Sequence, residues 1–269
     1  MSGCVPIHEC PCCGSSVHLP VLGDGGHGFD LVRCEQCGLV HALGRHPPGL
    51  LDIGYGERGA GQDEVDRQRK RRAVELYDRL SGGRIARPQP GARALDLGCN
   101  TGLLLDTLAE HGWATEGVER SPGAAAVAAQ QHRIHDLDLE DAQASTGARY
   151  QLVTMTHVLE HMVHPLEVTR FVARHLDEDG VGVIEVPNWD DAARALWGRS
   201  YRPLELGDHV CFFDRDSLRS TLELGGLRVE QLWSRPQGAT LVMPSLLSAL
   251  DVVRSLLPRR RQSSHGAMS

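Results

Sequence analysis

Lysine is almost absent from this chain: Lys70 is the only lysine, and arginine supplies the other 27 of its 28 basic residues. This scarcity argues against a lysine general base. Acidic residues number 35, which gives a formal net charge of −7. A protein of that overall charge does not present a surface suited to coating nucleic acid, so nucleic acid is not an expected partner.

The sequence also lacks a continuous apolar run of about 20 residues, the length that a membrane-spanning helix needs. Its first ten residues include Cys4, His8, Glu9 and Cys10 in place of the apolar core of a secretory signal peptide. We therefore expect a cytoplasmic protein without a membrane partner.

Length and composition predict one large domain and a small one. With 269 residues, 41% of them hydrophobic and 23% charged, the chain can bury a full apolar core. We expect a metal-binding module in residues 1–45, a linker in 46–64, a large domain in 65–243, and a C-terminal helix with a disordered basic tail in 244–269. The oligomeric state is left open.

Cysteine is concentrated near the N-terminus, where six of the eight cysteines fall within the first 37 residues. Cys10, Cys13, Cys34 and Cys37 form two Cys-x2-Cys pairs separated by 20 residues, the spacing of a zinc ribbon. A glycine follows each pair and lets backbone N–H groups turn toward a thiolate. Disulfides or free thiols are the alternative, but the cytosol disfavours disulfides. We predict one structural Zn²⁺ on these four thiolates, with Cys12 pointing away from it.

The predicted ribbon is acidic. Residues 1–60 contain three arginines, no lysine and six acidic residues, and four thiolates on Zn²⁺ add negative charge. Phosphate binding would therefore be electrostatically unfavourable there. We interpret the ribbon as a folding unit that packs on the large domain and is stabilised by its ion, because about 45 residues bury too little apolar area alone.

The segment 94–102, Ala-Leu-Asp-Leu-Gly-Cys-Asn-Thr-Gly, predicts a strand, a glycine loop and the start of a helix. A dinucleotide fingerprint has the spacing G-x-G-x-x-G and leaves the helix N-terminus free for a pyrophosphate. Here Gly98 and Gly102 are four residues apart and Asp96 precedes them. The carboxylate disfavours phosphate and favours a ligand with ammonium or sulfonium charge. An ordinary tight turn is the alternative for the glycine loop alone.

Two further acidic residues end predicted strands. Glu119 ends the strand 115–119, where its carboxylate could accept hydrogen bonds from both hydroxyls of a ribose. Asp136 follows in the third strand and could accept from an adenine amino group, with Asp138 as the alternative if the register differs by two residues. Strands alternate with helices as far as residue 186, which predicts a parallel sheet in an α/β fold.

These ordered motifs resemble the class I S-adenosylmethionine-dependent methyltransferases. Residues 96–102 are similar to the signature D-x-G-x-x-x-G, with Asn100 where the family often has a glycine, and asparagine tolerates positive φ. The run HVLEH at 157–161 and the run DHVCFFD at 208–214 resemble a group of the family that acts on small molecules. The resemblance covers about residues 65–243.

The resemblance implies a doubly wound, Rossmann-like, seven-stranded and mostly parallel sheet. It also implies S-adenosylmethionine as the cofactor. The residues that would hold it are Asp96, Gly98, Asn100, Gly102, Glu119 and Asp136.

A base assists methyl transfer when the acceptor is a hydroxyl or a carbon acid, and histidine is suited to this role near neutral pH. The candidates are His209, His161 and His157. His157 and His161 follow the fourth predicted strand, at the edge where doubly wound sheets bind ligands. His209 precedes an aromatic pair. Each of the three could instead be a structural or solvated histidine.

The remaining segments are predicted to complete the domain. Residues 189–206 are the candidate for a lid over the substrate. Residues 227–233 and 239–243 would supply a final antiparallel pair of strands, and residues 244–257 an amphipathic helix.

The sequence favours a methyltransferase that transfers the methyl group of S-adenosylmethionine to oxygen on a small hydroxylated metabolite or saccharide. Methylation of a protein or peptide side chain and C-methylation of a nucleotide-linked keto sugar are the enzymatic alternatives. A non-catalytic protein that holds the cofactor for assembly or regulation is the alternative from another class, and turnover distinguishes it from the enzymes.

Overall fold

The computed structural model describes residues 5–23, 29–46, 62–82, 85, 87–191, 194, 208–235 and 248–254. The predicted lid at 189–206 therefore lies outside the described residues except for 189–191 and 194. Residues 47–61 of the predicted linker and residues 255–269 of the predicted tail also lie outside them.

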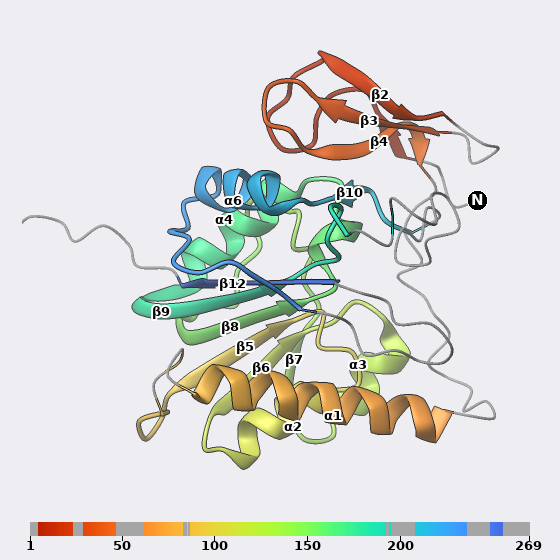
Figure 1. Ribbon diagram of the computed structural model, residues 1–269. Helices are drawn as coiled ribbons and strands as arrows, with labels where there is room; N and C mark the ends of the chain where they lie inside the picture. The colour runs from red at the N-terminus through yellow and green to blue at the C-terminus, as the bar shows by residue number, and fades with distance from the viewer. Residues whose placement is uncertain are drawn as a thin grey trace, which may run out of the picture.

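Seven strands form the central sheet (Figure 1). They are β5 (Arg93–Leu97), β6 (Ala114–Val118), β7 (Arg133–His135), β8 (Tyr150–Thr156), β9 (Leu176–Glu185), β11 (Trp233–Arg235) and β12 (Ser248–Arg254). Their spatial order is β11-β12-β9-β8-β5-β6-β7. The strands from β5 to β9 pair in parallel, whereas β12 runs antiparallel to both β9 and β11. The predicted seven-stranded, mostly parallel sheet is confirmed.

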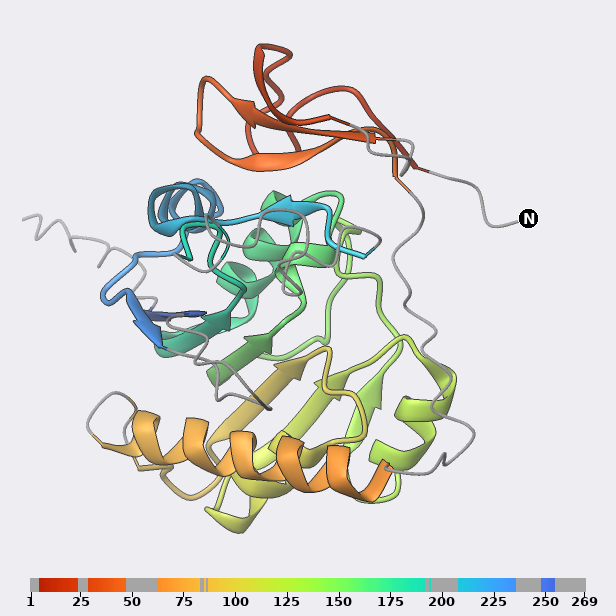
Figure 2. The same cartoon turned by 45° about the vertical axis from the view of Figure 1, so that its right-hand side comes forward.

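Helices cover both faces of this sheet, as both views show (Figures 1 and 2). The helices α1 (Gln62–Ser81), α2 (Leu103–Glu110) and α3 (Pro122–Ala128) lie on one face, and α4 (Pro165–His175) and α6 (Arg215–Leu224) lie on the other. A short 3-10 helix, η1 (Leu159–His161), follows β8. Because both faces are covered, the central strands are almost continuously buried, as four of the five residues of β5 show.

A second, antiparallel sheet stands on the α4 and α6 side of the molecule (Figure 2). Its strands are β1 (Val5–Ile7), β2 (His18–Leu22), β3 (Phe29–Cys34) and β4 (Val40–His46), in the order β1-β4-β3-β2. A fifth strand, β10 (Cys211–Phe212), comes from the large domain and pairs with β4 through Cys211 opposite His41. The N-terminal sheet is therefore completed by a segment about 170 positions further along the chain.

The two sheets also share an apolar core. Ile7, Phe29 and Leu31 of the N-terminal sheet belong to the same buried cluster as Leu218 and Leu222 of α6. This cluster confirms that the N-terminal module packs on the large domain. It also shows that the boundary predicted at residue 45 does not separate two independent cores.

The C-terminal part of the sheet differs from the prediction. A helix was expected at 244–257, but residues 248–254 form the strand β12, which fills the open edge of β9. β11 begins at Trp233, the last residue of the strand expected at 227–233, and the strand expected at 239–243 lies outside the described residues. The segment 248–254 contains Val252 and Val253, which are β-branched and favour a strand. A short apolar run has no periodicity that would distinguish a helix from a strand. Here the segment forms a strand because it pairs with the edge of β9.

None of the helices within the described ranges has the length and apolarity to cross a bilayer.

Candidate active site and cysteine cluster

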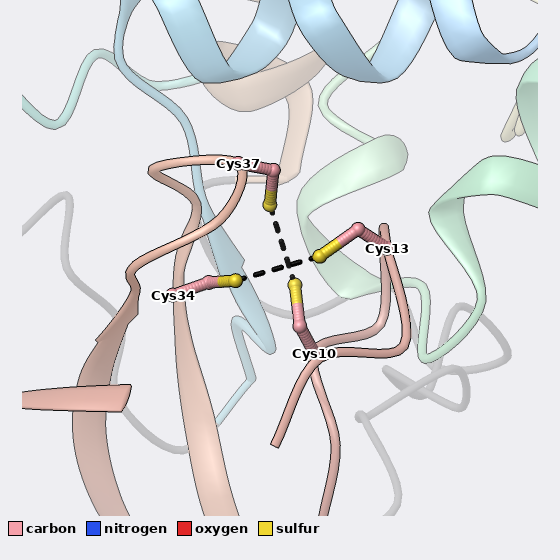
Figure 3. A group of neighbouring side chains, drawn as sticks. All are labelled: Cys10, Cys13, Cys34 and Cys37. Carbon is pink, nitrogen blue, oxygen red and sulfur yellow. Dashed lines mark hydrogen bonds between the residues drawn. The ribbon is translucent and has the colours of Figure 1, made fainter. Parts of the chain in front are cut away.

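Four cysteines converge in the N-terminal sheet, and their side chains point toward a common centre (Figure 3). The Sγ atoms of Cys10 and Cys37 are 3.4 Å apart, as are those of Cys13 and Cys34. All four sulfur atoms lie within 4.8 Å of one another, and all four cysteines are free. The structure thus brings together the four cysteines that the spacing predicted.

Two matching turns place these thiols. The N–H of Gly14 donates to the carbonyl of Cys10 at 2.8 Å, and the N–H of Gly38 donates to the carbonyl of Cys34 at 3.0 Å. Both glycines have positive φ, 73° and 78°, a conformation that other residues adopt only with strain. The N–H groups of the two glycines thus close the turns by donating to carbonyls, and the predicted contact with a thiolate stays a prediction for them.

Cys12 lies between two members of the cluster in sequence, and its thiol interacts with Cys37 as well as with the large domain. Its buried Sγ is 3.2 Å from the hydroxyl of Thr221 on α6. Nearby, Arg33 of β3 donates to the Asp214 carboxylate at 2.9 Å, and Asp214 is the N-cap of α6. The N-terminal sheet is thus joined to the large domain by polar contacts as well as by the apolar core.

The glycine loop lies between β5 and α2. Gly98 has φ 70°, and a Cβ there would collide with the side chain of Val158 after β8. Gly102, the N-cap of α2, has φ 87°, and a Cβ there would lie 3.2 Å from a ring atom of His132. Asn100 adopts φ 53°, the left-handed conformation that was expected of it. The loop therefore requires residues that adopt positive φ and leaves little room for added side chains.

Asp96 is the last residue but one of β5, just before this loop. Its side chain is fully buried and accepts a hydrogen bond of 2.7 Å from the Thr154 hydroxyl on β8. Burial raises the pKa of Asp96 to about 7, and the negative charge of Glu119 adds to the rise while Thr154 opposes it. A cationic ligand beside Asp96 would favour its ionised form.

Glu119 follows β6 directly and faces the glycine loop. Its Oε2 accepts from the N–H of Asn100 at 2.9 Å, and its Oε1 accepts from the N–H of Ser121 at 2.7 Å. A carboxylate offers about four acceptor positions, so two remain for the hydroxyls of a ribose. These two backbone contacts fix the orientation of the carboxylate at the carboxyl edge of the sheet.

Asp136 comes directly after β7 and is exposed, at the same edge of the sheet. Asp138, the alternative, accepts from the backbone N–H of Glu140 at 3.0 Å and pairs with Arg120 at 3.4 Å. Because the Asp138 carboxylate is already used in a local turn and an ion pair, Asp136 remains the better candidate for the adenine amino group.

His157 is the first of the three candidate bases. It adopts φ 55°, and its ring lies between two buried carboxylates, Glu160 at 3.2 Å and Glu185 at 3.6 Å. Burial alone would lower the pKa of His157, but the two carboxylates outweigh it and raise the pKa to about 10. His157 is therefore charged near neutral pH, and in that form it does not accept a proton.

His161 and His209 meet in a T-shaped ring contact with their centroids 4.7 Å apart. His161 lies in η1, and its Nδ1 is 3.1 Å from the carbonyl oxygen of Asp208. His209 is buried, and this burial lowers its pKa to about 4, although the charge of Glu160 opposes the shift. Its imidazole is therefore neutral near neutral pH.

Glu160 and Glu185 were not among the predicted site residues. Glu160 is 1% exposed, and its charge lies beside all three candidate histidines. Burial opposes its ionisation, yet the hydrogen bond from His157 keeps the pKa of Glu160 below its usual value. The HxxEH spacing could have identified it, because a turn after β8 brings positions 157 and 160 together. Glu185, at the end of β9, carries no such local signal.

Comparison with known proteins places this chain in a family. A family model described as a methyltransferase domain matches residues 65–232. The ubiquinone biosynthesis O-methyltransferase of Xanthomonas campestris pv. campestris is 32% identical over 118 residues, which cover 40% of this chain and 48% of that protein. The protein of the same name from Xanthomonas axonopodis pv. citri is 31% identical over 165 residues, covering 55% of this chain and 67% of the relative. The chain spans about half the length of the first of these relatives.

Solved structures show the same fold. Magnesium protoporphyrin IX methyltransferase (ChlM) from Synechocystis PCC 6803 with bound SAH is similar with a TM-score of 0.53 and 19% identity, over 74% of this chain and 90% of that one. A complex between the Haloferax volcanii Trm112 methyltransferase activator and a methyltransferase gives a TM-score of 0.56 at 15% identity, over 73% and 96% of the two chains. The match to more than half of the sequence, on this doubly wound sheet, establishes that the chain belongs to the methyltransferase domain family.

Proposed function

We propose that this protein is an S-adenosylmethionine-dependent methyltransferase that methylates a hydroxyl oxygen of a small metabolite or saccharide. The observation that supports it most is the fixed position of Glu119, whose two oxygens are anchored by backbone N–H groups beside the glycine loop. The 31–32% identity to ubiquinone biosynthesis O-methyltransferases favours oxygen as the acceptor atom.

Three acidic residues at the carboxyl edge of the sheet would hold the cofactor. Glu119 would accept hydrogen bonds from both ribose hydroxyls, and Asp136 would accept from the adenine amino group. Asp96 would order the loop and attract the ammonium end, since its charge lies beneath Gly98, Asn100 and Gly102. The positive φ values of these three residues allow the loop to approach the ligand closely.

S-adenosylmethionine, when bound, supplies a methyl group already activated on a sulfonium sulfur. The acceptor oxygen would form the new bond to this carbon while the carbon–sulfur bond would break, and the sulfur would keep the electron pair as a thioether. The hydroxyl proton leaves toward the base. The protein therefore mainly has to align the acceptor and to receive or release that proton.

The candidate base is His209, with His161 beside it. Both lie next to the segment after β8, where a doubly wound sheet binds its ligands, and the contact between Gly98 and Val158 brings this segment against the cofactor loop. The neutral state of His209 is the state in which an imidazole can act as a base. His157 has a different part, because its positive charge balances the buried carboxylates of Glu160 and Glu185.

Calorimetric titration with S-adenosylmethionine tests the cofactor site. Glu119→Ala and Asp96→Ala should each weaken binding by about 1.5–3 kcal/mol, the loss expected for charge-assisted hydrogen bonds. Glu178→Ala is the matched control, because Glu178 is exposed near the start of β9, at the opposite edge of the sheet. Unchanged affinity in both site variants would remove the assignment.

We also propose that the four-cysteine cluster holds a structural Zn²⁺. Thiolate sulfurs at about 2.3 Å from a tetrahedral ion lie about 3.8 Å apart, and the pairs at 3.4 Å are close to this arrangement. A disulfide needs a sulfur–sulfur distance of about 2.05 Å. Elemental analysis should find zinc in the purified protein that is lost in Cys34→Ser, and a native disulfide would contradict the proposal.

Turnover distinguishes the proposed enzyme from its alternatives. Transfer of a labelled methyl group to hydroxylated small molecules, with an ether methyl in the product, supports O-methylation. Transfer to peptides, or a product with a new carbon–carbon bond, favours the other acceptors. Cofactor binding without transfer to either class of acceptor favours a non-catalytic protein.

A further inference from the structure

A cavity lies at the amino edge of the central sheet, where the parallel strands begin. It is formed by the loop that precedes β8 and by the last turn of α4, and its volume of about 480 Å³ is in the range of small-molecule sites. Its polar lining consists of Gln143, Ser145, Arg149, Arg174 and His175, and no acidic residue lines it. The chain as a whole has a net charge of −7, so a cavity with this lining differs from the average surface.

His175 holds the loop against α4. It is buried, and its Nδ1 lies 2.8 Å from the carbonyl oxygen of Phe171, which only accepts, so Nδ1 carries the hydrogen. Its Nε2 accepts from the backbone N–H of Thr146 at 3.2 Å and lies 3.2 Å from the Ser145 hydroxyl. The loop is therefore ordered without a ligand, and binding does not have to supply the free energy for ordering it.

Two guanidinium groups give the cavity its charge. Arg174 has no ion pair with any residue that the structure describes, and Arg149 donates one N–H to the carbonyl of Leu176 at 2.7 Å, which leaves its other N–H groups available. Burial lowers the pKa of His175, and the charges of Arg174 and Arg149 lower it further, against the hydrogen bond to Phe171. Both positive charges thus act on the same side of the cavity.

The acidic residues that flank this region in sequence have other partners. The Asp141 carboxylate accepts from the backbone N–H of Gln143 at 2.8 Å, and the Asp177 carboxylate accepts from the side-chain amide of Gln151 at 2.7 Å. The carboxyl end of α4 adds the equivalent of about half a negative charge. Two full positive charges outweigh it, so the cavity favours an anion.

We propose that Arg149 and Arg174 bind the phosphate group of a small phosphate monoester in this cavity. Such a group carries a charge of about −1.5 to −2 near neutral pH and has three acceptor oxygens, which suits two guanidinium groups. The cavity is larger than a phosphate group alone, and Gln143 and Ser145 can form hydrogen bonds with the rest of the ligand.

This site is separate from the proposed cofactor site. The loop 142–149 comes before β8, at the amino edge, whereas Asp96 and Glu119 lie at the carboxyl ends of β5 and β6. A phosphate monoester can therefore bind together with S-adenosylmethionine, and the inference does not depend on methyl transfer.

Calorimetric titration of the full chain with inorganic phosphate and with glucose 6-phosphate tests the site, both with and without S-adenosylmethionine. Glucose 6-phosphate should bind more tightly than inorganic phosphate, and glucose should not bind. Because both arginines are exposed, the affinity should fall as salt is added. Arg149→Gln and Arg174→Gln should each weaken glucose 6-phosphate binding by about 10- to 100-fold, the loss expected for charge-assisted hydrogen bonds.

Arg170→Gln is the matched control. Arg170 lies one turn before Arg174 on α4, pairs with Glu167 and does not line this cavity. It should leave the affinity unchanged. Arg174→Gln decides the matter if Arg149→Gln, which also loses the bond to the Leu176 carbonyl, does not fold, as checked by circular dichroism.

Three results would overturn the inference: binding of neither phosphate probe, binding that Arg174→Gln retains, or an equal loss in Arg170→Gln. The last result would indicate attraction by the overall charge of α4 and not a site. S-adenosylmethionine titrations on the same variants separate this inference from the proposed function, because loss of phosphate binding at Arg174 should leave cofactor affinity unchanged.

Discussion

The two sheets of this chain are stabilised in different ways. In the central sheet, β5 and β8 are buried along almost their whole length between two layers of helices. In the N-terminal sheet, β2 exposes its apolar side chains, with Leu19 at 49% and Val21 at 37%. Helices therefore cover both faces of the central sheet, whereas the N-terminal sheet buries apolar side chains of β3 and β4 against the large domain and leaves part of β2 exposed.

The two sheets also differ in the sequence pattern that predicted them. Cysteine spacing predicted the N-terminal sheet, and the alternation of apolar strands with helices predicted the central one. Two short cysteine pairs identify the N-terminal module, because their spacing is a local signature in the sequence. The module also makes contacts with β10, Thr221 and Asp214 of the large domain. A local signature can therefore identify a small module, but it does not show how much the contacts with the rest of the protein stabilise that module.

The substitution Cys34→Ser should have the largest effect on the stability of the N-terminal sheet. Structural zinc sites in small peptides bind with about 10–16 kcal/mol of apparent free energy, and that binding is coupled to folding. We expect loss of the metal and a fall of several kcal/mol in the free energy of unfolding. The effect should extend to α6, which shares the core with the N-terminal sheet. Thermal unfolding combined with elemental analysis measures both effects.

Cys12→Ala is the control for that experiment. It lies in the same turn but contacts Thr221, so it should keep the metal and lose about 1–2 kcal/mol of stability. If Cys34→Ser lost zinc while the rest of the chain unfolded as before, the two sheets would be energetically separate.

At the carboxyl edge of the central sheet, a substitution of the candidate base should change the turnover rate and not the stability of the protein. His209→Ala should lower turnover by about 10²- to 10⁴-fold for a hydroxyl acceptor, while S-adenosylmethionine affinity stays nearly unchanged. Single-turnover kinetics and calorimetry measure the two quantities. Full turnover with weaker cofactor binding would place His209 in the wall of the cofactor site, and His161 would then be the next base to test.

Asp96 should make the central sheet sensitive to pH. Its folded pKa of about 7 lies above the ordinary value of 3.8, so the folded protein without ligand holds a proton that the unfolded chain has released. This contribution to stability is complete below about pH 4 and is lost as the pH rises toward 7, by about 1.4 kcal/mol for each pH unit.

Denaturant titrations between pH 5 and 8 should therefore show a slope that Asp96→Asn removes. S-adenosylmethionine affinity should rise over the same interval in the unchanged protein, because the cationic ligand favours the ionised carboxylate. Equal slopes in the two proteins would show that Asp96 is already ionised in the free protein.

The smallest expected effect is at the contact between the two sheets. Arg33→Gln removes the ion pair with Asp214 and the hydrogen bond to the carbonyl of Gly38, in a position that is about one-third exposed. We expect a loss of about 1 kcal/mol in the free energy of unfolding, without change in metal content. A loss comparable to that of Cys34→Ser would mean that this pair, not the thiols, holds the N-terminal sheet in place.

Much of the fold and of the candidate site could be predicted. The alternation of apolar strands with helices indicated the parallel sheet, and the structure places Glu119 and Asp136 directly after β6 and β7, where the sequence put them. The conformations of Gly98, Asn100 and Gly102 also follow from their positions in a tight turn. In each case the information is contained within a few neighbouring residues.

The strand β12 and the partners of the histidines could not be predicted in this way. Residues 248–254 form a strand because the edge of β9 is open for hydrogen bonds, and that edge is more than 60 positions earlier. The state of His157 depends on Glu185, which meets it only because β8 and β9 lie side by side.

The sequence by itself determined the alternation of parallel strands and helices along the chain, the glycine loop with its acidic residues, and the two cysteine pairs, because periodicity and turn chemistry act over short distances. Only the tertiary structure decided that β10 completes the N-terminal sheet, that β12 closes the central one, and that Glu160, His161 and His209 meet. These features arise from contacts between distant segments, where hydrogen bonding of open strand edges and burial of charge outweigh local preference.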